Sequence, residues 1–521
     1  MRVKHSWVLA LLLTGCQLTQ PTETGEAVTP ETNQPTIIKP SESSTQTVKP
    51  VAKPIPEVTP QTQQDVWQRI AMQMRLPVPE HKSVDYYRTW YLKHPNHLKT
   101  VSKRAQPFLY LITEKIEQRG LPLELALLPV VESSFDAFAY SHGSAAGLWQ
   151  FVPGTGKMYG LEQNFWYDGR RDVAAATDAA LDYLTYLNKR FDGDWTHAIA
   201  AYNSGGGRVS SAIRKNTRLG KPTDFFSLDL PKETSGYVPK LLALADIVAN
   251  QDKYGLEIPA IANHPVVELV DPKEQLDLAI AAEYAGISVK QLQSLNPAYN
   301  QWATAPEGAH KLLLPIETVA KFKQAAAANR GKGMKVVRYK VKSGDSLGVL
   351  ADKYNTTTQV IRTANNLSGN MIRVGQHLMI PTSTKGDNTY TLSATNRLAK
   401  TQATARGKYK ITHTVRSGDS LWSIARANKV SHQSLAKWNG MGPRDTLRVG
   451  QKLVIWKNSS DGAIIRTVFY NVRSGDTISG IANKFKVKSK DIVKWNDLST
   501  QKYLKLGQKL KLYVDVTKVS V

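Results

Sequence analysis

Apolar positions recur with helical spacing between residues 65 and 255. Residues 101–119 carry such a face, and Gly120-Leu121-Pro122 follows as a helix end. Residues 171–191 carry another, and a further helix is predicted over residues 237–249. Asp194 is placed to cap a short helix through Tyr202. The pattern predicts one all-α unit over residues 65–255, a length within the range of a single domain.

Within this unit, the stretch from Leu127 to Phe151 carries the most chemical information. An apolar segment, with Pro122 placed in the first turn of its helix, ends at a single carboxylate, Glu132. The C-terminal pole of a buried helix and a wall of apolar side chains both raise a carboxyl pKa, which suits a general acid near neutral pH. A glycine-rich stretch follows and ends at Trp149-Gln150-Phe151, which we expect to offer a sugar an aromatic face and an amide. The layout favours carbohydrate chemistry.

A different order of elements begins at residue 266. Strands are predicted at residues 266–269 and 310–314, with helices at 276–284 and 289–295 between them. This β-α-α-β order recurs three times, each copy starting with Ser-Gly-Asp and carrying an Asn 20 residues after the Asp. A fixed internal period indicates duplicated modules. The recurring residues are Gly344, Asp345 and Asn365, then Gly418, Asp419 and Asn439, then Gly475, Asp476 and Asn496.

The Ser-Gly-Asp segment favours a turn that caps a helix, and the Asn is placed to close the second helix. The units, at residues 337–382, 412–457 and 468–514, resemble LysM modules, which bind polymers containing N-acetylglucosamine. The resemblance implies that the recurring Gly, Asp and Asn residues contribute to glycan binding. Residues 266–318 resemble a degenerate fourth copy without Ser-Gly-Asp, the alternative being a helical extension of the catalytic unit. Residues 382–408 and 456–463 are predicted linkers, and modules joined this way bind by avidity.

Taken alone, Glu132 could be an ordinary helix-end glutamate, but three further motifs accompany it in a fixed order. The four are Glu132-Ser133, Gly147-Leu148-Trp149-Gln150-Phe151, Ala201-Tyr202-Asn203-Ser204-Gly205 and Glu233-Thr234-Ser235-Gly236-Tyr237-Val238. Together they resemble the motifs of family 1 lytic transglycosylases, goose-lysozyme-like enzymes that cut bacterial cell-wall glycan. The resemblance implies a multidomain protein in which an all-α lysozyme-like catalytic domain precedes a string of small βααβ (LysM) modules.

By this resemblance, Glu132 protonates the oxygen between N-acetylmuramic acid and N-acetylglucosamine and then accepts a proton from the muramoyl C6 hydroxyl. That hydroxyl closes on C1, so a 1,6-anhydro sugar forms and no water is consumed. An internal nucleophile makes a second carboxylate dispensable, and Asp136 is interpreted as a solvated loop carboxylate. The resemblance places substrate-binding side chains at Ser141, Gln150, Tyr202, Asn203, Glu233 and Tyr237.

Some features of the site region have other interpretations. Core packing is the alternative role for Tyr202 and Tyr237. Trp149 stands where many relatives have Met, which should alter the sugar subsite and leave the chemistry intact. His142 and His197 are interpreted as structural, since no nucleophile elbow or metal-ligand spacing accompanies them. No cofactor and no metal is expected.

Charge is distributed unevenly along the 521 residues. The chain has 68 Lys and Arg against 43 Asp and Glu, and residues 331–521 hold 34 of the basic residues, 10 Asp and no Glu. Basic regions often bind nucleic acid, but here the basic residues are dispersed among strand-like and helical pieces. A cell-wall polymer with free peptide carboxylates fits this charge equally well. The resemblance to lytic transglycosylases and LysM modules implies peptidoglycan as the partner, and no nucleic acid is expected.

The N-terminus has the features of an export signal. Arg2 and Lys4 precede an apolar run over residues 7–13, and Leu13-Thr14-Gly15-Cys16 closes it. This resembles a bacterial lipobox over residues 1–16, which implies lipidation at Cys16, the only cysteine of the chain. A plain signal peptide is the alternative. Gln17 after the cysteine favours the outer membrane, so a monomer anchored at its periplasmic face is expected.

Residues 17–64 are rich in Pro, Thr, Gln and Ser and predict a disordered tether. No later segment reaches the roughly 20 apolar residues of a membrane-spanning helix. Three alternatives to a transglycosylase stay open: a hydrolytic lysozyme, a non-catalytic lipid-anchored protein that binds the cell wall, and a DNA-binding protein.

Overall fold

The computed structural model describes residues 58–141, 143–308, 310–457, 465–498 and 504–515. Cys16, the predicted signal peptide, His142 and most of the predicted tether lie outside these residues. The last tether residues do not behave as predicted, because the Asn263 amide donates to the carbonyls of Pro60 and Gln63 at 3.2 and 2.9 Å. Within the described residues, no helix is long and apolar enough to cross a bilayer.

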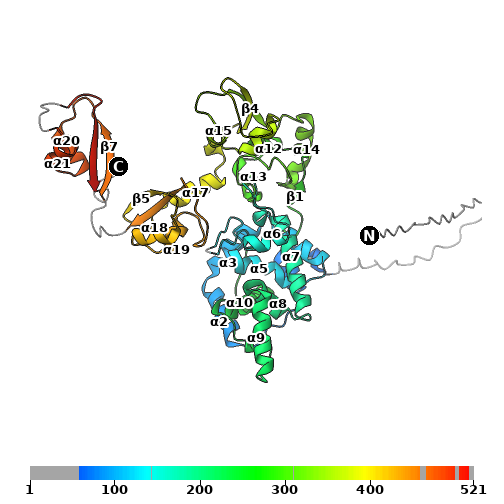
Figure 1. The fold of residues 1–521 in the computed structure, drawn as a ribbon. Helices are drawn as coiled ribbons and strands as arrows, with labels where there is room; N and C mark the ends of the chain where they lie inside the picture. The colour runs from blue at the N-terminus through cyan, green and yellow to red at the C-terminus, as the bar shows by residue number, and fades with distance from the viewer. Residues whose placement is uncertain (1–57, 142, 309, 458–464, 499–503, 516–521) are drawn as a thin grey trace, which may run out of the picture. The chain divides into compact units, whose positions relative to one another are not determined.

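The N-terminal part of the described chain is a helical unit around one apolar core (Figure 1). Most of the long helix α10 (Lys232–Ala249) is buried in this core, so the helices around it are held against a common partner. The prediction of an all-α unit is confirmed. Its α-helices are α1 (Val66–Ala71), α2 (Lys82–Lys93), α3 (Pro95–Ala105), α4 (Leu109–Gln118), α5 (Leu128–Ser133), α6 (Pro153–Met158), α7 (Val173–Arg190), α8 (Trp195–Ser204), α9 (Gly206–Arg218), α10 (Lys232–Ala249) and α11 (Gln251–Tyr254).

Helix boundaries follow local capping chemistry. The predicted helix over residues 101–119 is two helices, because Pro107, between α3 and α4, has no amide hydrogen to continue the ladder. Asp194 caps α8 as predicted, since its carboxylate accepts from the backbone N–H of His197 at 3.0 Å. The His197 ring lies against the same carboxylate (Nδ1–Oδ2, 3.0 Å), which agrees with a structural role.

The segment after the helical unit has the predicted β-α-α-β order. It comprises β1 (Val267–Val270), α12 (Leu278–Ala285), α13 (Val289–Leu295) and β2 (Leu312–Pro315), with the two strands antiparallel. Helix α14 (Val319–Ala328) follows, and its Phe322 is fully buried in the same core. The strands and helices of this segment therefore pack around an apolar core.

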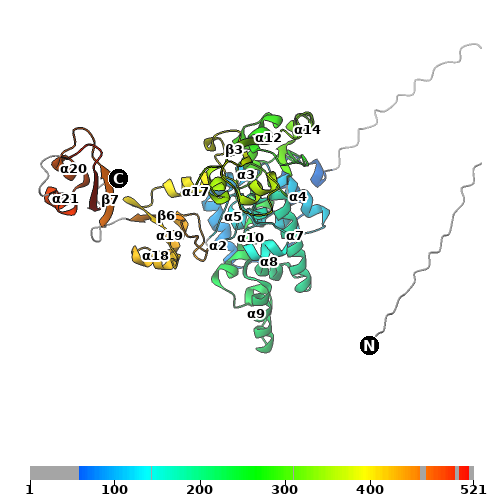
Figure 2. The same ribbon diagram turned by 45° about the horizontal axis from the view of Figure 1, so that its top comes forward.

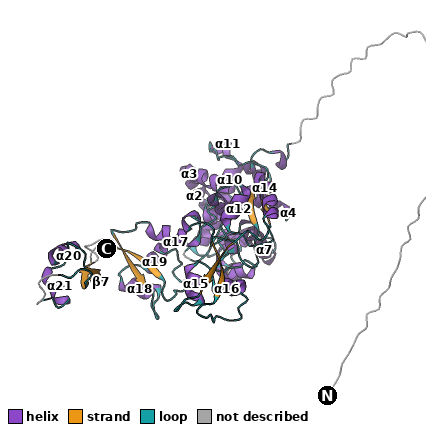
Figure 3. Cartoon of the chain, turned by 90° about the horizontal axis from the view of Figure 1, so that it is seen from above, coloured by secondary structure: helices purple, strands orange, loops and turns teal. Residues whose placement is uncertain are grey.

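Three more units with the same order follow, each with one antiparallel strand pair and its own small core. Figure 2 shows α20 and α21 together beside β7, and Figure 3 separates the orange strands from the purple helices. The predicted βααβ modules are confirmed. They comprise β3 (Lys335–Lys340), α15 (Leu347–Lys353), α16 (Thr358–Ala364) and β4 (His377–Thr382); β5 (Tyr409–Thr414), α18 (Leu421–Ala427), α19 (His432–Trp438) and β6 (Lys452–Lys457); and β7 (Ile465–Asn471), α20 (Ile478–Phe485), α21 (Ser489–Trp495) and β8 (Lys509–Asp515).

The linker prediction for residues 382–408 is wrong in its central part. Tyr390 is only 2% exposed, and its hydroxyl donates to the buried Asp277 carboxylate at 2.8 Å. Helix α17 (Ala394–Ala403) follows, capped by Ser393. The polar composition of the segment gave no sign of this structure, because one buried aromatic residue and one helix cap are enough to order a short segment. Of the other predicted linker, Trp456 is buried in β6, and residues 458–463 lie outside the described part of the chain.

Candidate active site

Glu132 lies where the sequence predicted it, in the last turn of a short buried helix. A 3-10 helix (Leu123–Leu127) leads into α5, and all five of its residues are buried. Pro122 occupies the N-cap position of the 3-10 helix, and Pro129 takes the first-turn position of α5 that had been predicted for Pro122. This buried 3-10 helix and the start of α5 fix the direction in which the Glu132 carboxyl points out of the core.

The carboxyl opens into a cavity of about 410 Å³. Four helices supply its wall, so residues far apart in sequence surround the one acid. The lining residues are Tyr86, Tyr87 and Trp90 of α2, Val131 and Glu132 of α5, Asn203 of α8, and Glu233, Gly236, Tyr237 and Lys240 of α10.

Burial raises the pKa of Glu132 to about 7, and its neighbours adjust that value in both directions. The Tyr237 hydroxyl donates to Oε1 at 2.5 Å and lowers the pKa, as does the positive charge of Lys240. The negative charge of Glu233 raises it. A carboxyl with this pKa is available as an acid and as a base near neutral pH.

Asn203 and Glu233 form a second polar group in the cavity. The Asn203 amide donates to Glu233 Oε1 at 3.4 Å, and the hydroxyl of Thr234 donates to Asn203 Oδ1 at 2.8 Å. Asp136, by contrast, does not line the cavity. Its side chain is 42% exposed and lies 4.0 Å from Arg104, which agrees with a solvated loop carboxylate.

Tyr202 lies behind the cavity wall and does not bond to Glu132. Its hydroxyl donates to the backbone carbonyl of Trp149 at 2.9 Å, and burial, followed by the negative charge of Glu132, raises the tyrosine pKa well above its ordinary value. The hydroxyl that donates to Glu132 belongs to Tyr237 instead.

Ser141 and Gln150 are not among the side chains that line the cavity. The Ser141 hydroxyl accepts from the backbone N–H groups of Gly143 and Ala145 at 3.2 and 3.1 Å. The Gln150 amide donates to the carbonyl of Gly147 at 2.7 Å. Both side chains therefore stabilise their own loop, and the structure does not bring them together with Glu132.

The predicted aromatic face at Trp149 and Phe151 is wrong. Trp149 is 0% exposed, and its Nε1 donates to the hydroxyl of Thr177 at 3.0 Å, while Phe151 is also buried. An apolar ring next to glycines packs inward when a neighbouring helix offers a partner for its N–H. Besides Tyr237, the aromatic residues of the cavity are Tyr86, Tyr87 and Trp90 of α2, which were not among the predicted site residues. The available signal was the pair Tyr86 and Trp90, four residues apart on one helix face.

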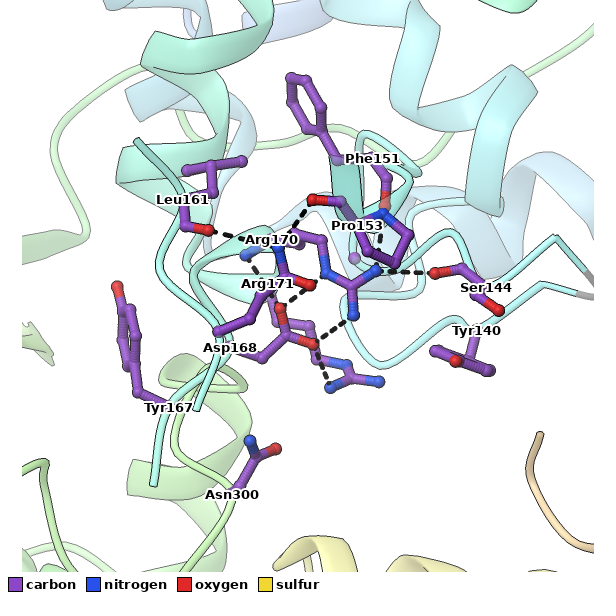
Figure 4. Close-up of polar contacts among 12 residues, drawn as sticks. Tyr140, Ser144, Phe151, Pro153, Leu161, Tyr167, Asp168, Arg170, Arg171 and Asn300 are labelled. Carbon is purple, nitrogen blue, oxygen red and sulfur yellow. Dashed lines mark hydrogen bonds and ion pairs between the residues drawn. The ribbon is translucent and has the colours of Figure 1, made fainter. Parts of the chain in front are cut away.

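A buried ion pair holds the loop that contains Ser141 and Gln150. The Arg170 guanidinium pairs with both Asp168 carboxylate oxygens at 2.8 Å and donates to the carbonyl of Ser144 at 2.7 Å. Figure 4 shows Arg170 lying between these two partners. Gly147 packs directly against the backbone of Arg170, since a Cβ on residue 147 would lie 2.0 Å from the Arg170 carbonyl oxygen. The glycine of the second motif thus allows the loop to pack.

In the C-terminal modules, the recurring Asn residues are structural. In the second module, Asn439 is 2% exposed, and its amide donates to the carbonyls of Leu435 and Val454 while it accepts from the Val454 N–H. Asn365 and Asn496 make the same three bonds in their modules. These hydrogen bonds join the second helix of each module to its closing strand.

The recurring Asp and Gly residues also build the turn. Asp345, Asp419 and Asp476 each accept from a backbone N–H and from a side chain on the preceding strand. The glycines before them adopt a positive φ of 84–86°, which favours glycine. They are Gly344, Gly418 and Gly475.

Asn296 makes the same three bonds in the 266–318 segment, where Asp277 caps the first helix. The spacing from Asp277 to Asn296 equals that from Ser346 to Asn365. This shared cap and amide is the sequence signal that links the segment to the other modules.

Family models match the chain in the order in which these units occur. A transglycosylase SLT domain matches residues 110–225, the LysM-like domain of lytic transglycosylase MltD matches residues 266–331, and LysM domains match residues 339–381, 413–456 and 470–512. Fold and site thus define a lysozyme-like transglycosylase domain joined to glycan-binding modules.

Individual relatives are similar to different shares of the chain. Membrane-bound lytic murein transglycosylase D from Escherichia coli is 36% identical over 410 residues, 76% of this chain and 86% of the relative. This chain belongs to the membrane-bound lytic murein transglycosylase D family, and the resemblance inferred from the four motifs is confirmed. An autolysin from Enterococcus faecalis is 32% identical over 31% of this chain and 22% of its own. The solved structure of lytic transglycosylase Slt from Pseudomonas aeruginosa is 23% identical over 27% of this chain and 24% of that chain, with a TM-score of 0.23.

Proposed function

We propose that this protein is a peptidoglycan lytic transglycosylase that cleaves the β-1,4 bond between N-acetylmuramic acid and N-acetylglucosamine. The products are glycan strands with 1,6-anhydro-N-acetylmuramic acid ends. The observation that carries the proposal is Glu132, a carboxyl with a pKa raised to about 7 that opens into a cavity between four helices. Membership of the transglycosylase family supports the same reaction.

In the first step, protonated Glu132 donates its proton to the bridging oxygen as the bond to C1 breaks. The carboxylate that results is stabilised by the Tyr237 hydroxyl and by the positive charge of Lys240. In the second step, this carboxylate removes the proton of the muramoyl C6 hydroxyl, whose oxygen forms the new bond to C1. Glu132 ends the cycle protonated, with the proton of the C6 hydroxyl in place of the one that leaves on the departing sugar, so one residue completes the cycle.

A hydrolytic muramidase is the second candidate, and one observation favours it. Glu233 lines the same cavity as Glu132 and raises its pKa, so the site holds a second carboxylate that could activate water. We favour the transglycosylase because Glu233 is already bonded by the Asn203 amide and because the family carries out the internal reaction.

Mass spectrometry of digested peptidoglycan distinguishes the two candidates. Wild-type protein should release products lighter by one water than hydrolysis products, and Glu132→Gln should release none while still binding sacculi. Glu233→Gln should retain anhydro products at a reduced rate. Reducing ends alone, together with complete loss of activity in Glu233→Gln, would identify the hydrolase.

We also propose that lipid at Cys16 anchors a monomer to the periplasmic face of the outer membrane. Cys16 follows Leu13-Thr14-Gly15 and precedes Gln17, which supports this placement. The Escherichia coli relative is named as membrane-bound. Incorporation of labelled palmitate into wild type, and its loss in Cys16→Ser, tests the anchor. Unlabelled wild-type protein would contradict it.

The modules are proposed to bind glycan strands near the active site. The recurring Gly, Asp and Asn residues hold the loops in shape, and Ser141 and Gln150 act on substrate only through the loop that they stabilise. Sacculus pulldown in the presence of excess DNA tests the partner, since retention that DNA abolishes would favour nucleic acid.

A further inference from the structure

We propose that Tyr86 and Trp90 of α2 form a platform on which one sugar ring of the glycan strand stacks, a subsite that rests on the proposed function. Both residues line the cavity that contains Glu132. They lie four residues apart and therefore on one face of the helix. The platform lies outside residues 110–225, where the transglycosylase domain matches.

The exposure of Tyr86 is the first observation that calls for a ligand. Tyr86 is 65% exposed, whereas Val84 and Tyr91 of the same helix are buried. A single exposed aromatic residue is ordinary on a protein surface. Here, however, a second and a third aromatic side chain, Tyr87 and Trp90, line the same cavity.

Trp90 is held in a fixed orientation by its neighbours. Its ring stacks on His94 with centroids 4.5 Å apart and planes at 21°, and it meets Tyr91 and His97 edge-on at 5.2 and 5.3 Å. A preorganised flat surface loses little conformational entropy when a ligand binds to it. The apolar face of a pyranose ring, with its axial C–H groups, is the chemistry that such a surface accepts.

Helix α2 is also fixed relative to the acid. Arg88 of α2 donates to Asp246 of α10 at 2.6 Å. The hydroxyl of Tyr87 occupies the space left by Gly236, where a Cβ would lie 2.3 Å from it. Since α10 also carries Tyr237, the platform and the hydrogen bond to Glu132 are positioned by the same helix.

The test replaces Tyr86 in the full-length protein and measures the formation of anhydro products from purified glycan strands. Tyr86→Ala should raise KM about tenfold and change kcat less than twofold, because the residue binds a sugar but does not touch the reacting atoms. Tyr86→Leu should behave like Tyr86→Ala, as it keeps apolar volume without a flat face. Tyr86→Phe should retain the wild-type KM. Tyr186→Ala, at an exposed tyrosine on α7 outside the cavity lining, is the matched control.

Binding separates this subsite from the reaction. In the Glu132→Gln background, titration with purified oligosaccharides of alternating N-acetylglucosamine and N-acetylmuramic acid should show weaker binding when Tyr86→Ala is added, with the modules identical in both proteins. Weaker binding with no anhydro product from wild type would retain the subsite and defeat the proposed reaction. Anhydro product with unchanged KM and unchanged binding in Tyr86→Ala would overturn the subsite alone. A loss in Tyr86→Phe equal to that in Tyr86→Ala would also overturn it, since a hydroxyl contact would then explain the effect.

Discussion

The neighbours of Glu132 should move its pKa in opposite directions, and this can be followed through the pH dependence of the reaction. Tyr237→Phe removes a hydrogen bond that favours the carboxylate, and Lys240→Met removes a positive charge, so both should raise the pKa. Glu233→Gln removes a negative charge and should lower it. The signs follow from the contacts alone.

The size of the Tyr237→Phe effect follows from the contact distance. A hydrogen bond at 2.5 Å to a charged acceptor is worth about 1.5 to 3 kcal/mol. One pH unit corresponds to about 1.4 kcal/mol. We therefore expect the pKa of Glu132, about 7 in wild type, to rise by about one pH unit or more in Tyr237→Phe. The charge substitutions should have smaller effects, because solvent in the open cavity screens them.

The assay is kcat/KM for anhydro product as a function of pH, whose high-pH limb reports the pKa of the essential acid in the free enzyme. That limb should move to higher pH in Tyr237→Phe and Lys240→Met and to lower pH in Glu233→Gln. Asp136→Asn, at a carboxylate outside the cavity, should leave it in place. A limb that stays fixed in all three variants, or moves upward in Glu233→Gln, would refute the assignment of Glu132 as the acid.

Four further predictions concern stability. Gly236→Ala should lower the thermal midpoint and the activity, because the added Cβ meets the Tyr87 hydroxyl. Adding Tyr87→Phe should recover part of both. No recovery in the double variant would contradict the close contact between Gly236 and Tyr87. Arg170→Ala should destabilise the catalytic unit by about 3 kcal/mol in denaturant unfolding, since the buried Asp168 carboxylate loses both side-chain bonds from Arg170 and keeps only Arg171 as an ion-pair partner. Asn439→Ala should destabilise the second module by about 2 kcal/mol through four lost hydrogen bonds, one of them from Gln402, seen as faster amide exchange in that module only. Burial raises the pKa of Glu132 from 4.5 to about 7, so the folded wild-type protein loses stability as the pH rises across that window. Glu132→Gln should therefore be more stable than wild type by about 3 kcal/mol above pH 7 and equally stable below pH 4.5. A stability difference that is independent of pH would contradict the raised pKa.

The parts of the fold that could be predicted depend on local pattern. The placement of Glu132 in the last turn of α5, the Asp194 cap and the β-α-α-β order each follow from apolar spacing and capping residues within about 20 positions. The position of Glu132 in the catalytic unit could be predicted for the same reason. Its pKa could be predicted in direction, because burial and a helix C-terminus act with the same sign.

The parts that could not be predicted depend on contacts between distant segments. Nothing near Trp149 indicates that Thr177 would receive its N–H, so an inward ring was taken for a sugar-binding face. The platform on α2 lies far in sequence from Glu132 and becomes part of the cavity only because α10 packs between them. The recurring Asn residues were assigned to glycan because a repeat shows that a residue matters, but not whether it holds the fold or the ligand.

Product analysis of wild type and Glu132→Gln side by side tests the central claim most directly. The account predicts that wild type converts purified peptidoglycan entirely to fragments with 1,6-anhydro-N-acetylmuramic acid ends, and that Glu132→Gln, folded and still bound to sacculi, releases none. Fragments with ordinary reducing ends from wild type, or anhydro fragments from Glu132→Gln at the wild-type rate, would contradict it.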